Sequence, residues 1–239
     1  MKYPGTNCDE ETARALRLVG FEAKVVPITR VGDRHLEKAR LVVLSGGFSY
    51  GDYVMAGRLA QIETEIRLGD ALSEFVAEGG YALGICNGFQ ILSKLGLLPE
   101  GSLIDNTSGR YQCRWAELRK ESAESPYLTN LPDVFELPIA HAEGRFVAAK
   151  GNAKKYLEKG LVALRYTEDV NGSEERIAGL QDETKRVLGL MPHPERFIYA
   201  EHHYDPDWLR KEGTADWGWG YYLFESIYER ITAMSPAGA

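Results

Sequence analysis

Residues 81–90, with the sequence YALGICNGFQ, constrain this chain more than any other stretch. An apolar run ends at Cys86, and glycines stand two places before and two places after it, at Gly84 and Gly88. An apolar pattern with helical spacing follows at once. Glycine leaves room where a strand turns sharply into a helix. The G-x-C-x-G arrangement is typical of a nucleophile elbow and predicts a strand, a strained turn at Cys86 and a helix.

Cys86 in such a turn is expected to act as a nucleophile. The helix that begins directly after it aims backbone N–H groups and a partial positive charge at the sulfur, which favours the thiolate. A buried core cysteine is the competing interpretation, because free cysteine is among the most buried residue types. The flanking glycines and the immediate helix start favour the nucleophile. Cys8 and Cys113 lack this turn, so both are expected to be packing residues.

Composition limits the remaining possibilities. The chain has 239 residues, 44% of them hydrophobic, which suffices for a substantial core. A net charge of -7 without a basic cluster argues against a nucleic-acid partner. Three cysteines without a C-x-x-C pair argue against a disulfide framework, and we expect no metal site. No signal peptide and no apolar run of membrane-spanning length is visible, so we expect a cytoplasmic protein away from membranes.

The pattern of apolar runs predicts an α/β fold. In the first half, helical patterns alternate with short apolar strands, as is typical of a doubly wound, mostly parallel sheet flanked by helices. These helices span 9–19 and 56–78, and these strands span 22–28, 41–44 and 81–85. In the second half, closely spaced strands predict a smaller antiparallel or mixed element before a last helix. These strands span 111–118, 135–139, 146–149, 161–166, 177–181 and 187–191, and the helix spans 221–231.

The elements are expected to form a single domain over residues 1–239. The most linker-like stretch is 120–132, which is rich in Ser, Pro, Asn and charged residues. The polar, aromatic segment 201–219 either packs on the domain or touches a partner. Its tryptophans are expected to be packing anchors rather than a cofactor stack. They are Trp208, Trp217 and Trp219.

A glycine-rich loop, SGGFSYGDY at 45–53, leaves the apolar strand 41–44. Its three glycines allow backbone N–H groups to approach a ligand closely. A flexible turn is the alternative. We favour a ligand-binding loop, because parallel sheets bind ligands at the carboxyl ends of their strands and Cys86 ends the next strand.

His193 is the strongest candidate for the base that a thiolate nucleophile needs. It follows the apolar strand 187–191, as Cys86 follows its own strand, and flanking prolines stiffen its loop. Glu195, two residues later, is close enough to bond the imidazole nitrogen that faces away from the sulfur. A surface-loop histidine is the alternative, which the cysteine elbow elsewhere in the chain outweighs.

Other histidines are weaker candidates. His141 also follows an apolar strand, and it either lines the same cleft or packs in the core. His202 and His203 lie in a polar, acidic stretch and are expected to be solvated.

These residues predict a reaction class. Cys86 attacks a carbonyl that carries a nitrogen leaving group, and His193 returns a proton to the departing ammonia and then activates water. The oxyanion of the intermediate needs two preorganised donors. We expect one to be the N–H of Asn87 and the other an N–H of Gly47 or Phe48.

The sequence is also similar to a known family. GICNGFQ at 84–90 and the distant HPE at 193–195 resemble the class I glutamine amidotransferases, the triad family. Within that family, further motifs resemble the stand-alone glutaminase subunits that serve a synthetase of purine biosynthesis. These motifs are PGTNCD at 4–9, GGFSYGDY at 46–53, PIAH at 138–141, NGS at 171–173, IAG at 177–179 and MPHPER at 191–196.

The resemblance implies a flavodoxin-like domain that hydrolyses glutamine to glutamate and passes ammonia to a large synthetase subunit. It implies ATP and magnesium on that large subunit, no cofactor on this chain, and a small bridging subunit as a further partner. Gln90 and His141 match positions expected to line the glutamine pocket. Relatives usually carry a full apolar strand before the PGTNC stretch, where this sequence has only residues 1–3.

Two alternatives compete with this function. A related cysteine-elbow hydrolase would keep the fold and act on another substrate, but such relatives usually place the histidine directly after the cysteine, where Asn87 stands here. A catalytically inert regulatory subunit of the same fold is the other alternative. The presence of Cys86, His193 and Glu195 together argues against it.

Overall fold

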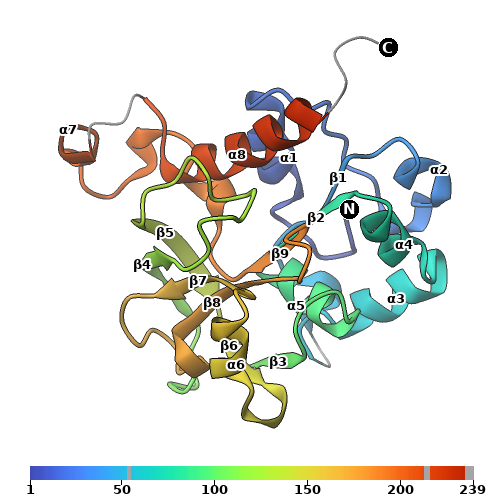
Figure 1. Ribbon diagram of the computed structural model, residues 1–239, viewed down its shortest axis with the longest axis horizontal. Coiled ribbons are helices and arrows are strands. Elements are labelled where there is room, and N and C mark those ends of the chain that lie inside the picture. The colour runs from blue at the N-terminus through green and yellow to red at the C-terminus, as the bar shows by residue number, and fades with distance from the viewer. Residues whose placement is uncertain (53–54, 213–215, 235–239) are drawn as a thin grey trace.

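A seven-stranded sheet forms the centre of the computed structural model, which describes residues 1–52, 55–212 and 216–234 (Figure 1). The strands follow the order β1-β2-β9-β8-β7-β4-β5. A second, two-stranded sheet pairs β3 with β6 in antiparallel fashion. The larger sheet therefore joins elements from both halves of the chain into one layer.

The first three strands of the order run parallel and build the core beneath the predicted site. They are β1 (Leu41–Leu44), β2 (Tyr81–Ile85) and β9 (Val187–Leu190). Every residue of β2 and of β9 is buried, as is typical of parallel strands that are covered on both faces. Ile85 pairs with Leu190, so these two strands end at the same level of the sheet.

The other strands continue the sheet in antiparallel pairs. They are β8 (Ile177–Gln181), β7 (Val162–Tyr166), β4 (Gln112–Lys120) and β5 (Val134–His141). The small sheet consists of β3 (Gly101–Ile104) and β6 (Arg145–Ala148). The α/β class and the antiparallel second half are confirmed, and the antiparallel strands extend the main sheet itself.

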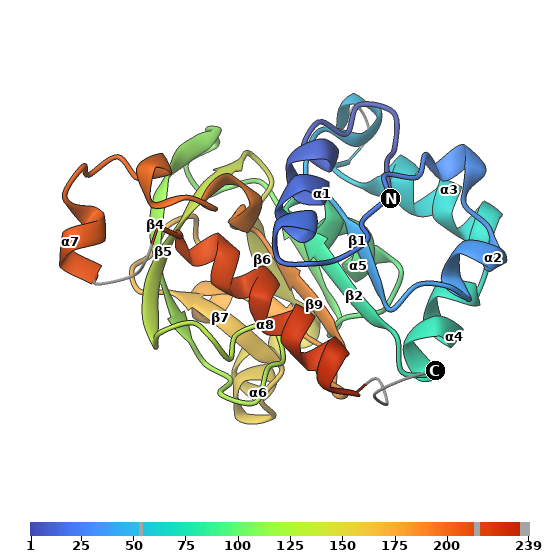
Figure 2. The ribbon, with the colours of Figure 1, turned by 90° about the horizontal axis from the view of Figure 1, so that it is seen from above.

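Helices cover both faces of the parallel part (Figures 1 and 2). On one face, α1 (Asp9–Leu18) packs against α8 (Trp219–Met234). On the other, α3 (Arg58–Leu68) packs against α5 (Asn87–Lys94), which lies on β1, β2 and β9. The remaining α-helices are α2 (Asp33–Leu36), α4 (Ala71–Ala77), α6 (Ala153–Glu158) and α7 (Trp208–Glu212).

Short 3-10 turns connect these elements. They are η1 (Ile28–Arg30), η2 (Ser49–Asp52), η3 (Ala149–Gly151), η4 (Glu174–Arg176), η5 (Pro194–Arg196) and η6 (Ala200–His202). Two of them lie in segments predicted to form the site: η2 belongs to the glycine-rich loop and η5 contains Glu195. Within the part of the chain that the structure describes, no helix is long and apolar enough to cross a bilayer.

The predicted strand at 22–28 was wrong. Its one β-bridge among the described residues is parallel and joins Pro27 to Lys2, in the short stretch 1–3. The backbone N–H of Lys2 donates to the carbonyl of Val26, and that of Ile28 donates to Lys2. With so short a neighbour, an apolar stretch cannot build a ladder and stays extended without strand pairing.

Two further expectations about loops need correction. The linker-like stretch 120–132 packs firmly on the domain, because Tyr127, Leu128 and Leu131 are buried in the core. His203, expected to be solvated, is buried against Trp115 and Trp208 and pairs with Glu136 at 3.1 Å. The described part of segment 201–219 therefore packs on the domain, and residues 213–215 lie outside the described part.

The tryptophans of this segment act as packing anchors, as predicted. Trp208 and Trp219 are buried and meet edge to face at 5.4 Å between ring centroids. Trp217 stacks on Tyr221 at 4.3 Å. The first of these contacts ties α7 to the start of α8.

Candidate active site

Cys86 occupies a strained turn between β2 and α5. Its φ of 51° lies in the left-handed region, which residues other than glycine rarely adopt. The turn is held by backbone bonds: the N–H of Cys86 donates to Leu190 at 2.7 Å, and the N–H groups of Phe89 and Gln90 donate to the Cys86 carbonyl. This is the backbone geometry that the G-x-C-x-G spacing predicted.

The two glycines around Cys86 are required by close backbone packing. A Cβ atom at Gly88 would lie 1.9 Å from the backbone oxygen of Leu44, and one at Gly84 would lie 2.6 Å from the oxygen of Gly88. Both contacts are far shorter than atoms tolerate. Glycine therefore lets α5 press against β1 and β2 while the turn projects Cys86 over the end of the sheet.

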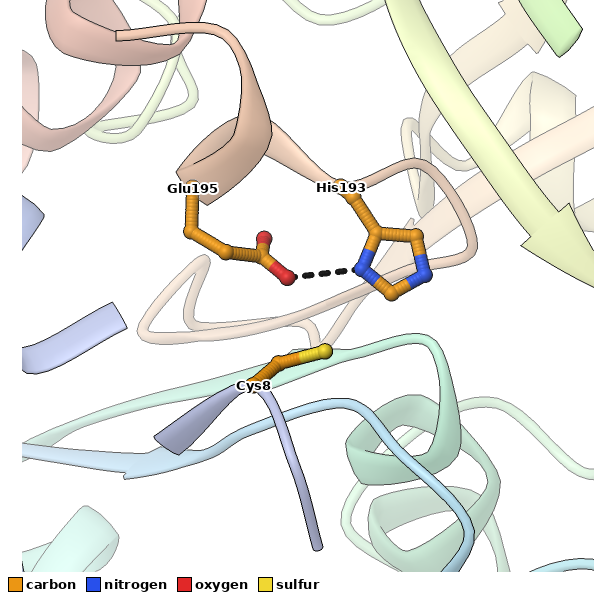
Figure 3. Close-up of side chains that lie close together, drawn as sticks. All are labelled: Cys8, His193 and Glu195. Atoms are coloured by element: carbon orange, nitrogen blue, oxygen red, sulfur yellow. Dashed lines mark hydrogen bonds and ion pairs between the residues drawn. The ribbon is translucent and has the colours of Figure 1, made fainter. Parts of the chain in front are cut away.

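His193 and Glu195 form a buried hydrogen-bonded pair beside this turn. The imidazole Nδ1 lies 2.6 Å from Oε1 of Glu195, and both side chains are almost fully buried (Figure 3). The N–H of His193 donates to the carbonyl of Pro138 at 2.8 Å, which ties the loop to β5. The start of α8 closes over the loop, because a Cβ at Gly220 would lie 1.8 Å from the backbone oxygen of Pro194.

Gly46 shows how closely Cys86 and His193 approach one another. A Cβ atom at Gly46 would lie 2.8 Å from Cε1 of His193 and 3.4 Å from Cβ of Cys86. The two side chains therefore flank the same glycine. The Nε2 atom of His193, the nitrogen that does not face Glu195, has no hydrogen-bond partner among the described residues. It is available for proton transfer in the cleft.

The surroundings of His193 favour its protonated form. Burial alone would lower the pKa of this imidazole, but the negative charge of Glu195 raises it. The neighbouring sulfurs of Cys86 and Cys8 act in the same direction as Glu195. The pKa of His193 is raised well above its usual value. The imidazole can therefore hold the proton that Cys86 gives up.

Cys8 lies in this site. The prediction that it is only a packing residue was therefore wrong. Its sulfur, at the start of α1, points toward the His193–Glu195 pair (Figure 3). Nη2 of Arg196 donates to that sulfur at 3.1 Å. Cys113, also expected to pack, is exposed on β4. β4 lies between β7 and β5, and the sequence around Cys113 did not reveal that its side chain faces the exposed side of this strand.

Cys8, His193 and Glu195 are the group best arranged to hold a metal ion among the described residues. Their ligand atoms all lie within 4.8 Å of one another, and sulfur, nitrogen and carboxylate oxygen are the ligands that zinc prefers. However, the guanidinium of Arg196 already contacts the sulfur, and a second cation beside it is unfavourable. Glu195 is also engaged with His193.

A cleft of about 260 Å³ opens in front of these side chains. It brings together the predicted residues Cys86, His193, Gly47, Phe48, Gln90 and His141. It also contains residues that the sequence analysis did not select: Asn7, Cys8, Tyr111, Glu143 and Arg196. Asn7, Cys8 and Arg196 lie within the motifs PGTNCD and MPHPER, and Glu143 is two residues after His141, so a place in or near a motif was the available signal.

The glycine-rich loop forms one wall of the cleft and is held by the PGTNC stretch. The N–H of Tyr50 donates to Pro4 at 2.6 Å, and the N–H of Cys8 donates to Gly46 at 3.3 Å. Gly47 has a φ of 129° and its missing side chain leaves space for Asn7. Tyr53, the last residue of this predicted loop, lies outside the described residues. Which N–H groups serve the oxyanion stays a prediction.

Gln90 and Glu143 also line the cleft and contact each other. The side-chain amide of Gln90 donates to the carbonyl of Glu143 at 2.6 Å and accepts from the amide of Asn87 at 2.9 Å. Oε2 of Glu143 accepts the N–H of Ala56 at 3.2 Å. Glu143 is only partly buried, so its carboxylate remains able to meet a cation in the cleft.

The chain matches the CobB/CobQ-like glutamine amidotransferase domain over residues 1–229. It is 41% identical over 198 residues to the phosphoribosylformylglycinamidine synthase subunit PurQ of Thermotoga maritima, which covers 82% of this chain and 85% of the relative. Subunit PurQ of a Synechococcus strain is 40% identical over 219 residues, which cover 90% of this chain and 92% of the relative.

Solved structures agree with these relatives. The structure of PurLQS from Thermotoga maritima matches with a TM-score of 0.79 at 36% identity and covers 96% of each chain. The glutaminase domain of Trypanosoma brucei CTPS matches with a TM-score of 0.59 at 9% identity, covering 95% of this chain and 89% of that one, and shows a shared fold alone. The chain belongs to the glutamine amidotransferase family and, within it, to the PurQ subunits of phosphoribosylformylglycinamidine synthase.

Proposed function

We propose that this cleft hydrolyses glutamine with Cys86 as the nucleophile, and that the ammonia serves the synthesis of phosphoribosylformylglycinamidine in purine biosynthesis. The observation that carries the assignment is the strained turn of Cys86 beside the buried His193–Glu195 pair. A strained backbone at a cysteine is costly to maintain and is typical of a catalytic position. The family membership supplies glutamine as the amide.

The geometry supports two chemical steps. In the first, His193 takes the thiol proton, the sulfur attacks the carboxamide carbon, and the C–N bond breaks as His193 returns the proton to departing ammonia. A γ-glutamyl thioester remains on Cys86. In the second, water attacks the thioester as His193 takes its proton, the C–S bond breaks and releases glutamate, and His193 returns the proton to the sulfur of Cys86. Glu195 stabilises the imidazolium in both steps without itself taking a proton.

The cleft walls suggest how glutamine is held. The carboxylate of Glu143 suits the α-ammonium group, because it is partly exposed and accepts only one backbone N–H. The N–H of Asn87 follows the nucleophile directly, and Gly47 and Phe48 line the same cleft as Cys86. These N–H groups are our candidates for stabilising the oxyanion of the tetrahedral intermediate.

The partner that consumes the ammonia is a synthetase subunit, in line with the PurLQS assembly that the similar structure contains. We further propose a small bridging subunit. ATP and magnesium are assigned to the large synthetase subunit, and this chain needs no cofactor for the two steps above.

Cys86→Ala tests this function in the full complex. Glutamine-dependent synthesis should be lost, while synthesis from added ammonium salts should continue at the wild-type rate. Cys113→Ala, which removes an exposed cysteine, is the matched control and should leave both activities unchanged. Loss of the ammonia-dependent reaction would mean that the variant disrupts the assembly, and retained glutamine-dependent synthesis would refute Cys86 as the nucleophile.

A labelling experiment distinguishes the substrate. Glutamine should protect Cys86 from alkylation. A related hydrolase of another substrate, or an inert regulatory subunit, would show labelling of Cys86 without protection by glutamine.

A further inference from the structure

His141 presents an unused nitrogen to the same cleft. Its ring is buried and its Nε2 atom has no hydrogen-bond partner among the described residues. The ring lies flat against Gly144, since a Cβ there would sit 2.2 Å from Nδ1. The orientation of the imidazole is thus fixed, and what remains to be settled is which nitrogen carries the proton.

The hydrogen bonds of Asn106 determine which ring nitrogen of His141 carries the hydrogen. Its Nδ2 atom donates to two backbone carbonyls, those of Arg110 and His141, each at 2.9 Å. Its Oδ1 atom lies 3.4 Å from the N–H of Gly144 and 3.1 Å from Nδ1 of His141. A carbonyl oxygen can only accept and a backbone N–H can only donate. The opposite orientation of the amide would set oxygen against oxygen and N–H against N–H, so the orientation is determined by three independent neighbours.

The consequence for His141 follows directly. Because Oδ1 of Asn106 is an acceptor, Nδ1 of His141 must carry a hydrogen. In the neutral ring, Nε2 then has a lone pair and no hydrogen. Burial, together with the nearby charge of His193, lowers the pKa of His141 to about 4, so the ring remains neutral at ordinary pH.

We propose that Asn106 is a positioning residue that holds His141 as the Nδ1–H tautomer, so that Nε2 accepts a hydrogen bond from an N–H group of glutamine. The inference rests on the proposed function, because it takes glutamine as the occupant of the cleft. A buried acceptor without a partner is unfavourable in the empty site and becomes satisfied when a donor binds. Glutamine offers two such donors, the α-ammonium group and the carboxamide.

The tautomer can be measured in the unmodified protein. Heteronuclear NMR of histidine labelled at both ring nitrogens reports which nitrogen is protonated, and His141→Asn identifies the signal by its disappearance. We expect a neutral ring with hydrogen on Nδ1 at neutral pH. A ring with hydrogen on Nε2, or a doubly protonated ring, overturns the proposal. In Asn106→Leu, the His141 signal should no longer show a single Nδ1–H form.

Kinetics of a matched pair of variants test the acceptor. His141→Asn keeps a donor toward Asn106 but has no atom in the place of Nε2, and KM for glutamine should rise about tenfold with little change in kcat. His141→Gln can place its amide oxygen near the position of Nε2 and should recover most of the loss. An unchanged KM in His141→Asn, or an equal loss in both variants, contradicts the proposed role.

The choice between the two donors is made with an ester substrate, L-glutamate γ-methyl ester, which lacks the carboxamide N–H. If the increase in KM of His141→Asn persists with the ester, Nε2 contacts the α-ammonium group; if it vanishes, Nε2 contacts the carboxamide. Failure of the proposed function would be seen differently, as wild-type complex that hydrolyses no glutamine. The NMR measurement does not depend on activity and tests the tautomer in either case.

Discussion

Glu195→Gln is the substitution that tests the catalytic geometry most directly. It exchanges one oxygen for an NH2 group of nearly the same size, and the other oxygen can still accept from Nδ1 of His193. The charge is therefore removed while the shape is kept. Neutralising a buried carboxylate also removes its desolvation cost, so we expect the variant to fold normally.

The size of the effect follows from the 2.6 Å contact between Nδ1 and Oε1. That contact places the centres of the imidazolium and carboxylate charges roughly 4 Å apart. With an effective dielectric constant of about 20, their attraction is about 4 kcal/mol. If this attraction develops as His193 takes the proton from Cys86, its loss lowers kcat/KM about 10³-fold.

The assay is glutamine-dependent turnover of the complete complex over a range of pH. The charge of Glu195 raises the pKa of His193, so the imidazolium of the wild type persists to higher pH than an ordinary histidine would. In the variant this pKa falls, and the alkaline decline in rate should move to lower pH. Glu201→Gln, an exposed change in η6, is the matched control and should change neither rate nor profile. Turnover within a few-fold of the wild type, with an unmoved alkaline limb, would rule out Glu195 as the partner of His193.

Three other predictions address stability and substrate binding. Gly88→Ala places a Cβ 1.9 Å from a backbone oxygen of β1 and should destabilise the fold by about 3 kcal/mol or more in urea unfolding, whereas Gly32→Ala, in open space, should not. Tyr127→Phe removes a hydroxyl that bonds one carbonyl of β2 at 2.9 Å and one just before β9 at 2.7 Å, and should cost about 1–2 kcal/mol of unfolding free energy; an exposed control, Tyr204→Phe, should cost nothing measurable. Glu143→Gln should raise KM for glutamine about tenfold or more with kcat nearly kept, because a charge-assisted bond to the α-ammonium is lost, and an unchanged KM would reject that contact.

The sequence predicted the elements whose structure is decided locally. The turn at Cys86 could be predicted because two glycines at fixed spacing are needed only where backbone segments approach closely. The last helix could be predicted because its apolar residues recur with helical period, at Leu223, Ile227 and Ile231. Prolines around His193 likewise marked a stiff loop after an apolar strand. In each case neighbouring residues carry the information.

The features that could not be predicted from the sequence depend on contacts with distant parts of the chain. The segment 22–28 has the composition of a strand, but its one β-bridge among the described residues joins Pro27 to Lys2. His203 stands in a polar stretch and is nevertheless buried, because Trp115 and Trp208 close over it. Cys8 belongs to a quoted motif, but the motif did not place it beside His193, since α1 meets η5 only in the folded chain.

The active site itself depends on one such long-range choice, the placement of β9 directly beside β2. These strands lie far apart in the sequence, and in parallel register Ile85 pairs with Leu190. Cys86 and Met191 therefore leave the sheet at the same level, and the chain needs only two more residues to bring His193 to the cleft. Side chains alternate between the two faces of a strand, so a slip by one residue would turn the face that each strand presents and carry the loop out of line with the sulfur. The register of two buried strands, as much as the identity of the residues beyond them, sets the distance between thiol and imidazole.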